Sequence, residues 1–314
     1  TFKVPIISIG NITAGGTGKT PFTLFLIKHL IKDYLKIAVV SRGYGRKSKG
    51  VILASDGKEN FQSVEKSGDE PLLIARKFPN IVVIVAEDRR KGIQLAIEQF
   101  NAELILLDDA FQHRKVNRDC DIVLIDSNNQ LSNEKILPVG NLRERIHHLN
   151  RANITIFTKI EGDIKNDERR LISDNFNGLI FNSTHKISNI TDRLLKPIAE
   201  VKSLQDKSVV AFSGIANPDS FKISLLNIGI NVVDFIPFKD HQWYTKEHIK
   251  KIETVAQKNN CKIILTTEKD MVKLDVDFLQ GYDLLAVAME IKVKEQQELI
   301  KKVKDCIDSK IKIG

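Results

Sequence analysis

A glycine-rich loop near the N-terminus carries the most specific chemical pattern in this sequence. Residues 6–9 read Ile-Ile-Ser-Ile and predict a buried strand, and Gly18, Lys19 and Thr20 open a stretch with helical spacing. A strand, a glycine-rich loop and a helix in this order are the context of a phosphate-binding loop. Glycines leave the backbone N–H groups free to surround phosphate oxygens, and the helix adds the positive end of its dipole.

Two side chains of this loop would have distinct roles in such a site. Lys19 would reach the β- and γ-phosphates of a nucleoside triphosphate, and the Thr20 hydroxyl would be a ligand of Mg²⁺. The common pattern has a glycine six residues before the lysine, where this sequence has Thr13, and a glycine-rich turn without a ligand is the alternative interpretation. The residues that we expect to bind the nucleotide are Thr13, Ala14, Gly15, Gly16, Thr17, Gly18, Lys19 and Thr20.

Two acidic pairs could supply the metal ligand and the proton acceptor of a phosphoryl transfer. Residues 104–107 are an apolar run followed by Asp108 and Asp109, which is typical of a strand that aims a carboxylate at Mg²⁺. Asp69 and Glu70 precede a proline, and one of them could accept a proton from an attacking hydroxyl. The alternative for Asp69 is a structural role as the cap of a helix.

Basic and polar side chains follow other predicted strands, where a parallel sheet would place a ligand. Arg42 is flanked by small residues and can reach an anion, with Tyr44 available for stacking or a hydrogen bond. Arg143 is a candidate for charge stabilisation at a phosphate, and Glu144 is a candidate for orienting a hydroxyl of the substrate or nucleotide. An exposed turn and a solvated charged loop are the respective alternatives.

Two further loops add candidates to the same cleft. Gln112 and His113 follow the paired aspartates so closely that a plain loop is the weaker explanation. His241 stands next to Asp240 after a predicted strand, and it could pair with a carboxylate of the first half, although a lone histidine is more often structural. Lys269 also follows a predicted strand and could face this cleft.

The elements that must position these residues alternate between short apolar runs and helical patterns, which predicts an α/β fold with a parallel sheet. In the first half we expect strands at residues 6–10, 37–41, 81–85, 104–108 and 122–126, and helices at 20–32, 70–77 and 89–100. In the second half we expect strands at residues 154–158, 209–213, 231–235, 263–266 and 284–288, and helices at 219–227, 245–258 and 294–305. We therefore predict a P-loop NTPase-like parallel sheet domain (1–150), which ends in a long functional loop (127–150), and then a smaller α/β domain (151–314).

The composition is that of a globular protein and favours anionic partners. The 314 residues include 48 basic and 40 acidic side chains, so the net charge is +8. A positive net charge favours nucleotides, phosphorylated substrates, an acidic membrane surface or nucleic acid as partners, although a soluble protein with many surface lysines has a positive net charge too. The three cysteines form no metal or disulfide pattern, which favours a reducing cytosol.

Seven segments in order resemble the tetraacyldisaccharide 4′-kinase family of lipid A biosynthesis, and they span nearly the whole chain. They are Gly-Asn-Ile-Thr-Ala-Gly-Gly-Thr-Gly-Lys-Thr-Pro (10–21), Ser-Arg-Gly-Tyr-Gly (41–45), Gly-Asp-Glu-Pro (68–71), Asp-Asp-Ala-Phe-Gln-His (108–113), Leu-Pro-Val-Gly-Asn-Leu-Arg-Glu (137–144), Asp-His-Gln-Trp-Tyr (240–244) and Thr-Glu-Lys-Asp (267–270). Only the phosphate-binding loop is strong alone, but the ordered set is highly specific. Thr13 is itself typical of that family's loop.

The resemblance implies an ATP- and Mg²⁺-dependent kinase that phosphorylates the 4′-hydroxyl of a tetraacylated glucosamine disaccharide 1-phosphate. It would act as a peripheral protein at the cytoplasmic face of the bacterial inner membrane. Asp69 would be the base, assisted by His241, and Thr20 with Asp108 or Asp109 would hold Mg²⁺. The family's cleft corresponds to Arg42, Arg89, Arg143 and Glu144, to which our candidates add Tyr44, Glu70, Gln112 and His113. We expect a lipid substrate and a membrane surface as partners, with no nucleic acid and no obligate protein partner.

Two other classes of protein stay open on the sequence. A nucleotide switch or metallochaperone-type NTPase would use the same loop to drive partner binding without group transfer. A nucleic-acid-binding protein would also be basic, but no aromatic and basic platform or groove-reading motif supports that class.

Overall fold

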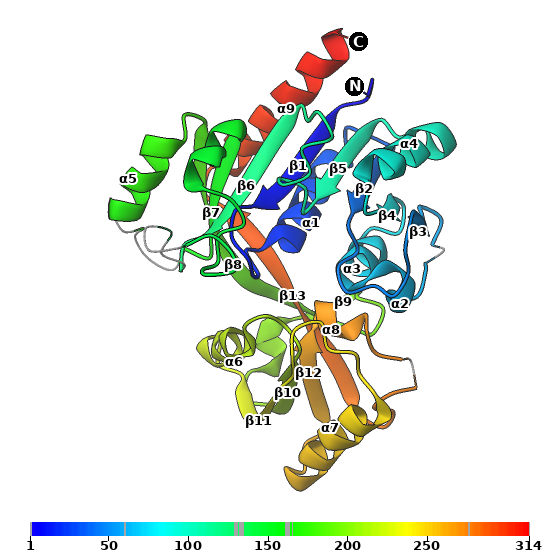
Figure 1. The fold of residues 1–314 in the computed structure, drawn as a ribbon. Helices are drawn as coiled ribbons and strands as arrows, with labels where there is room; N and C mark the ends of the chain where they lie inside the picture. Colours follow the sequence, from blue (N-terminus) through cyan, green and yellow to red (C-terminus); the bar gives the residue numbers. More distant parts are fainter. Residues whose placement is uncertain are drawn as a thin grey trace.

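The fold is a mixed α/β arrangement in which one large, mostly parallel sheet runs through two lobes (Figure 1). The structure, a computed structural model, describes residues 2–59, 61–128, 131, 135–160, 164, 166–275 and 277–313. The strands in these ranges are β1 (Ile6–Asn11), β2 (Ile37–Ser41), β3 (Ile52–Asp56), β4 (Val82–Val85), β5 (Leu104–Asp108), β6 (Cys120–Asp126), β7 (Ile154–Thr158), β8 (Leu179–Thr191), β9 (Pro197–Glu200), β10 (Ser208–Ser213), β11 (Asn231–Pro237), β12 (Ile263–Thr267) and β13 (Asp283–Val293). The helices are α1 (Lys19–Leu30), α2 (Val64–Ser67), α3 (Asp69–Lys77), α4 (Arg89–Phe100), α5 (Asn166–Asn175), α6 (Pro218–Asn227), α7 (Lys246–Lys258), α8 (Glu268–Met271) and α9 (Gln296–Ile313), with short 3-10 turns η2 (Ile146–Arg151) and η3 (Val201–Leu204).

The first part of the sheet places the predicted motifs at one edge. Its strand order is β3-β4-β2-β5-β1-β6-β7-β8, and all neighbours are parallel except β3 and β4. Along β5, Leu104 and Leu106 pack into the core with α1 and α9, whereas Ile105 and Leu107 pack into the core with α4. Helices therefore cover both faces, as continuous apolar strands predict. Because the strands are parallel, the loops after β1, β2 and β5 meet at the carboxyl edge.

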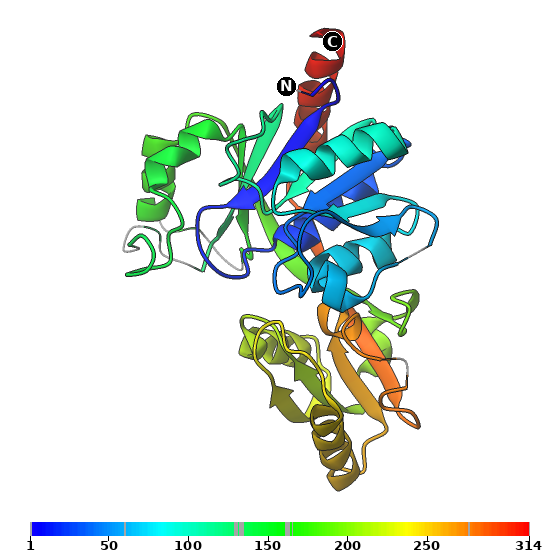
Figure 2. The same cartoon turned by 45° about the vertical axis from the view of Figure 1, so that its right-hand side comes forward.

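The long strands β8 and β13 connect this part of the sheet to the second part. Residues 179–182 of β8 pair with β7, and residues 183–191 pair antiparallel with β13. The sheet then continues through the parallel strands β12, β10 and β11. We call β1 to β7 with α1 to α5 and α9 the first lobe, and β9 to β12 with α6 to α8 the second lobe. Figure 2 shows β8 and β13 as the connection between the two lobes.

The division between the lobes differs from the predicted boundary between residues 150 and 151. Strand β7 pairs with β6, and α5 packs into a core with β6 and β7, so both belong to the first lobe. The C-terminal helix α9 also belongs to the first lobe, because its residues Leu299, Val303 and Ile307 are buried in the core beneath β1. The periodicity of a local stretch of sequence does not show which lobe an element joins, since the residues that it packs against lie far apart in the sequence.

Strand β8 was missed by the sequence prediction. It joins the lobes and is only partly covered, so after the short apolar run at Leu179, Ile180 and Phe181 its residues are a mixture of polar and half-buried side chains. Strand β13 and helix α9 extend well beyond their predicted ends, whereas the predicted bounds of β2, β5, β7 and α4 agree with the structure. Within the predicted loop over 127–150, residues 129, 130 and 132–134 lie outside the described part of the chain.

We expect loss of the α9 side chains from the first-lobe core to destabilise the protein. Leu299→Ala and Ile307→Ala should each lower the free energy of unfolding by about 2–5 kcal/mol, because each leaves a cavity at a fully buried position. Lys301→Ala on the exposed face of the same helix is the control and should change it by less than about 0.5 kcal/mol. Urea denaturation measures all three, and equal midpoints would contradict the packing of α9 on this lobe.

Candidate active site

The phosphate-binding loop lies between β1 and α1 at the carboxyl edge of the sheet. Gly18 precedes α1 with a φ of 89°, and Gly15 has a φ of 104°, both in the left-handed region that glycine tolerates. A Cβ atom at Gly18 would lie 2.7 Å from Nε2 of His185, which comes from β8. The tip at Gly15 and Gly16 is exposed, so backbone groups are accessible there. This geometry agrees with a phosphate-binding loop.

Residues at the carboxyl ends of β6 and β7 hold the loop in place. The Thr158 hydroxyl donates to the carbonyl oxygen of Thr17 at 2.9 Å. Lys159 Nζ lies 2.7 Å from the carbonyl oxygen of Gly16 and 2.6 Å from Asp126 Oδ2. These residues were not among those predicted for the site. Their position at the carboxyl ends of apolar strands of a parallel sheet is the signal that could have identified them.

A second segment, residues 137–143, is held against the loop by backbone hydrogen bonds. The N–H of Ala14 donates to the carbonyl oxygen of Asn141 at 2.7 Å, and the N–H of Arg143 donates to that of Ile12 at 2.7 Å. Arg143 is thereby brought to the carboxyl end of β5, although the two are far apart in the sequence.

Asp109 lies between two positive side chains. Its Oδ1 is 2.8 Å from Arg143 Nη1 and 3.5 Å from Lys19 Nζ. Burial alone would raise the pKa of Asp109, but the charges of Lys19 and Arg143 lower it below its ordinary value. Three residues predicted for the site from separate segments therefore meet at one point.

Asp108 is the fully buried tip of β5. Its carboxylate accepts hydrogen bonds from the hydroxyls of Thr23 at 3.2 Å and Ser41 at 3.4 Å. Burial and the negative charges of Glu70 and Asp109 raise the pKa of Asp108 to about 7. Burial and the two acidic neighbours thus oppose ionisation of this carboxylate, and a divalent cation bound beside it would favour the ionised form.

Asp69 and His241 meet across the two lobes. Asp69 is the buried first residue of α3, and His241 lies in the loop after β11 with a φ of 54°. Nδ1 of His241 is 2.8 Å from Oδ2 of Asp69. The other carboxylate oxygen of Asp69 accepts from the N–H of Glu70 at 2.9 Å, so the residue also stabilises the start of the helix. Burial alone would raise the pKa of Asp69, but the hydrogen bond with His241 and the charge of Lys269 lower it, which keeps the carboxylate ionised at neutral pH.

Three of the remaining predicted cleft residues are oriented toward open space or the neighbouring loops. Tyr44 is 67% exposed, and its ring centroid lies 5.0 Å from that of His241. Arg42 is exposed beside it. Nε2 of His113 lies 3.9 Å from Asp88 Oδ1, beyond hydrogen-bonding distance.

The other three, Arg89, Gln112 and Glu144, have partners within the protein. Arg89 is buried, and its Nη2 donates to the carbonyl oxygen of Asp109 at 3.2 Å. Gln112 Nε2 donates to the carbonyl oxygen of Asn11 at 2.9 Å. Glu144 is paired with Arg151 at 2.8 Å, and also with a neighbouring histidine. These contacts stabilise the loops around the site, and a ligand contact for these three residues stays a prediction.

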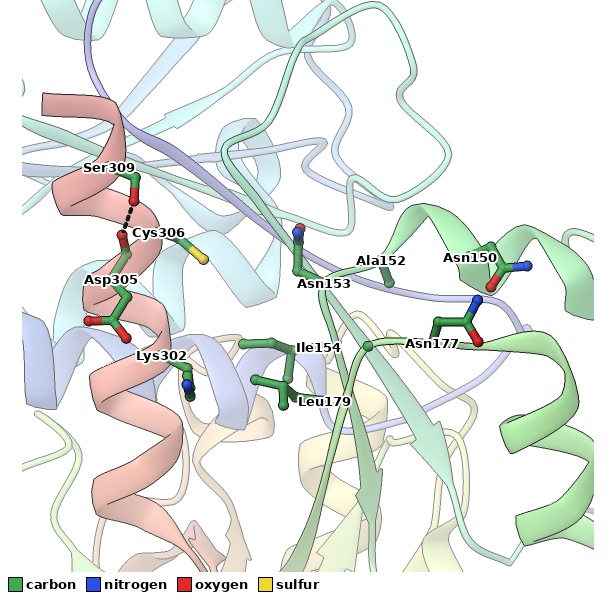
Figure 3. Close-up of a pocket in the computed structure, with 11 residues that line it drawn as sticks. Asn150, Ala152, Asn153, Ile154, Asn177, Leu179, Lys302, Asp305, Cys306 and Ser309 are labelled. Atoms are coloured by element: carbon green, nitrogen blue, oxygen red, sulfur yellow. Dashed lines mark hydrogen bonds between the residues drawn. The ribbon is translucent and has the colours of Figure 1, made fainter. Parts of the chain in front are cut away.

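One cavity lies away from this edge of the sheet. It has a volume of about 590 Å³ and is lined by α9 and by the segments where β7 and β8 begin, including Asn153, Leu179 and Cys306 (Figure 3). These are the amino ends of the parallel strands, so the cavity opens at the edge opposite the phosphate-binding loop. None of the predicted site residues lines it.

A side chain at Gly18 should disturb the loop. Gly18→Ala places an L-residue at a φ of 89° and a Cβ against His185, so we expect a loss of at least about 1 kcal/mol in the free energy of unfolding. The matched control is Gly16→Ala, whose Cβ would approach nothing closer than Ala216 Cβ at 3.8 Å. Thermal unfolding compares the two, and equal midpoints would contradict this packing of the loop.

Comparison with known proteins agrees with this arrangement. The chain matches the protein-family model described as tetraacyldisaccharide-1-P 4′-kinase over residues 1–308. A curated relative from Chlorobium luteolum, named tetraacyldisaccharide 4′-kinase, is 39% identical over 280 residues, which cover 87% of this chain and 78% of the relative. A relative of the same name from Aquifex aeolicus is 36% identical over 304 residues, which cover 96% of this chain and 87% of the relative.

The structural comparison gives the same result. A crystal structure of LpxK from Aquifex aeolicus, described as an "apo" form in complex with ATP, superimposes with a TM-score of 0.78 and 32% sequence identity. The match covers 98% of this chain and 89% of that chain. On the whole-length family match, the relatives and the shared fold, the chain belongs to the tetraacyldisaccharide-1-P 4′-kinase family.

Proposed function

We propose that the chain transfers the γ-phosphate of ATP to the 4′-hydroxyl of a tetraacyldisaccharide 1-phosphate. The contact between Asp69 and His241 carries this proposal. A phosphate-binding loop alone binds a nucleotide, whereas transfer to an alcohol also needs a group that accepts the hydroxyl proton. Asp69 is buried and ionised, and the preceding Gly68 lies against Tyr44, in the loop that follows β2. Membership of the family supports the choice of substrate.

In this mechanism Asp69 accepts the proton as the 4′-oxygen attacks the γ-phosphate. The hydrogen bond with His241 fixes the orientation of the carboxylate. Lys19 and the loop N–H groups neutralise phosphate charge. Arg143, which lies beside the Asp109 carboxylate as Lys19 does, adds a second positive charge there. Positioning and charge stabilisation supply most of the acceleration in such a transfer.

The residues at the tip of β5 fit Mg²⁺ by their chemistry. Asp108 and Asp109 offer carboxylates and Thr20 offers a hydroxyl, the oxygen ligands that this ion prefers. Among the described residues no group of three His, Cys, Asp or Glu side chains is placed to hold a metal ion. Mg²⁺ does not require such a group, since it is bound through one or two carboxylates together with waters and substrate phosphates. Bound there, the ion would neutralise charge on the transferred phosphate.

We also propose that the second lobe closes over the cleft during the reaction. The phosphate-binding loop, Asp108 and Asp69 belong to the first lobe, whereas His241 and Lys269 belong to the second. Closure would exclude water from the phosphoryl group and so limit hydrolysis of ATP. This is the role that we assign to the smaller α/β domain.

Removal of the Asp69 carboxylate should abolish most of the transfer. We expect Asp69→Ala to lower turnover by about two to four orders of magnitude, because the attacking hydroxyl loses its proton acceptor. Binding of ATP should change little, since the phosphate-binding loop is intact. The assay follows label from ATP into a detergent-dispersed tetraacyldisaccharide 1-phosphate in the presence of Mg²⁺.

The unaltered chain is the reference for this assay. If it transfers no label to the lipid, the proposed activity is wrong, and nucleotide-dependent association with another protein would then favour a switch. Turnover that survives in Asp69→Ala would reduce Asp69 to a residue that stabilises the start of α3.

Exposed apolar side chains beside the phosphate-binding loop support a site of membrane contact. Ile136, Leu137 and Val139, which we call the apolar tip, are 40%, 49% and 76% exposed. Leu137 and Val139 belong to the segment at residues 137–143, whose Asn141 and Arg143 are hydrogen-bonded to the loop, and Ile136 directly precedes it. The apolar tip is therefore fixed close to the site of phosphate binding. No helix in the described ranges is both long and apolar enough to span a bilayer.

The charged side chains among the described residues that line the hollow beside the apolar tip are positive. A hollow of about 560 Å³ beside it is lined by Lys135, Arg145 and His147 together with apolar residues, and its described lining contains no acidic side chain. Apolar residues flanked by positive charge complement an anionic bilayer surface. We therefore propose that the chain works as a peripheral protein at the cytoplasmic face of the inner membrane, with the apolar tip on the lipid.

Polar replacements in the apolar tip should weaken vesicle binding. We expect Leu137→Ser combined with Val139→Ser to lower binding to anionic phospholipid vesicles roughly tenfold, since about 1–2 kcal/mol of apolar burial is lost. The control combines Leu194→Ser with Ile198→Ser, which are 62% and 54% exposed near β9 in the second lobe. Vesicle co-sedimentation measures both, and an equal effect of the two pairs would contradict a specific role of the tip.

A further inference from the structure

Two of the three cysteines meet at the amino edge of the first-lobe sheet. Cys120 is the first residue of β6 and is fully buried, and Cys306 of α9 packs against the same core. Their side chains are hydrogen-bonded to each other, and both thiols are free. No spacing in the sequence pairs these residues, so only the fold brings the two thiols together.

Cys306 is the thiol of this pair that a small molecule can reach. It is partly exposed and lines the cavity of about 590 Å³ at the amino ends of β7 and β8, together with Asn153 and Lys302. Figure 3 shows its side chain pointing from α9 toward these strands. A reagent that enters the cavity would therefore meet the sulfur of Cys306, while Cys120 is enclosed in the core.

The surroundings of Cys306 favour its thiolate, which is the reactive form of a cysteine. The hydrogen bond with Cys120 lowers the pKa of Cys306 to about 7 against the effect of burial. Asp305 and Asp119 raise this pKa and Lys302 lowers it, each by a smaller amount. The same hydrogen bond and burial raise the pKa of Cys120. The accessible sulfur is therefore the better nucleophile, and the buried sulfur is held beside it as a thiol.

We propose that Cys120 and Cys306 are a redox-active pair, which forms a reversible disulfide when a hydroperoxide enters the cavity. The bond would join β6 to α9 within the first lobe. It is independent of the proposed phosphoryl transfer, because the cavity opens at the edge of the sheet opposite the phosphate-binding loop. In a reducing cytosol such a bond is transient and forms only under oxidising conditions.

The reaction consumes one hydroperoxide for each disulfide. The Cys306 thiolate attacks the terminal peroxide oxygen, the O–O bond breaks, and the leaving oxygen takes up the proton that Cys306 had released. The sulfur of Cys120 then attacks the resulting sulfenic acid, so that the S–S bond forms and the S–O bond breaks. The departing hydroxide leaves as water with the proton of Cys120. The two sulfurs together lose two electrons, which the peroxide gains, and a dithiol reductant returns them.

The bond would hold the C-terminal helix on the first lobe. Leu299, Val303 and Ile307 attach α9 to this lobe by packing alone. A disulfide adds stability chiefly by restricting the unfolded chain, and the effect grows with the length of the loop that it closes. The loop between residues 120 and 306 spans more than half of the chain. We therefore expect the oxidised chain to be more stable than the reduced chain.

The direct test is mass spectrometry of the chain after treatment with hydrogen peroxide. The reduced chain is exposed to a small excess of peroxide, alkylated with iodoacetamide and digested without reductant. We expect two of the three thiols to escape alkylation, a linked peptide pair that contains Cys120 and Cys306, and recovery of both thiols with dithiothreitol. Cys306→Ser should abolish the linked pair. Cys261→Ser is the matched control and should retain it, because Cys261 lies in the core of the second lobe.

Thermal unfolding tests the effect on α9. Oxidation should raise the midpoint of the unaltered chain by about 3 °C or more, and dithiothreitol should reverse the rise. Cys306→Ser treated in the same way should show no rise, which separates the disulfide from other effects of peroxide. Three alkylated thiols after treatment, a linked pair that includes Cys261, or Cys306 oxidised to a sulfinic acid without a disulfide would each overturn the inference. An unchanged midpoint in the disulfide-linked chain would refute the stabilisation of α9.

Discussion

The antiparallel ladder between β8 and β13 sets the distance between the two lobes, and the active site depends on that distance. One end of β8 is a strand of the first lobe beside β7, and the rest of β8 pairs with β13, which continues into the sheet of the second lobe. The same strand presents His185 to Gly18, where an added Cβ would lie 2.7 Å from Nε2 of the histidine. The ladder thus contacts the phosphate-binding loop and also carries the lobe that supplies His241 to Asp69.

The acidic groups of the site differ in how their charge is balanced, and the difference agrees with their proposed roles. Asp109 lies between Lys19 and Arg143, and Asp69 lies between His241 and Lys269, so the pKa of each is lowered. Asp108 is fully buried and has negative neighbours, so its pKa is raised although the Thr23 hydroxyl and Lys19 act against the rise. Of the two balanced carboxylates, that of Asp69 suits a base, which must be ionised before the reaction. An unbalanced one suits a position where a cation arrives with the nucleotide.

The segment at residues 137–143 connects three parts of the proposed function. Its backbone is hydrogen-bonded to the phosphate-binding loop, Arg143 reaches Asp109, and the apolar tip is exposed at its start. A kinase whose acceptor is a lipid must bring a membrane-bound hydroxyl to a nucleotide held in water. A short segment that contacts both the nucleotide loop and the lipid surface would limit the distance between them.

Local sequence determined the phosphate-binding loop and most strands of the first lobe. The strand, the glycines and the start of the helix are contiguous, and the positive φ angles at Gly15 and Gly18 are a property of glycine itself. The buried parallel strands are continuous apolar runs, so their bounds were close to those predicted. The family resemblance implied that His241 assists Asp69, but only the tertiary structure shows that the two side chains meet, 172 residues apart in the sequence. A position after a strand predicts the edge of the sheet where a residue lies, but it does not identify the loop of the other lobe that faces it. Strand β8 escaped prediction for the same physical reason, because its half-exposed polar residues form a strand only through pairing with β7 and β13.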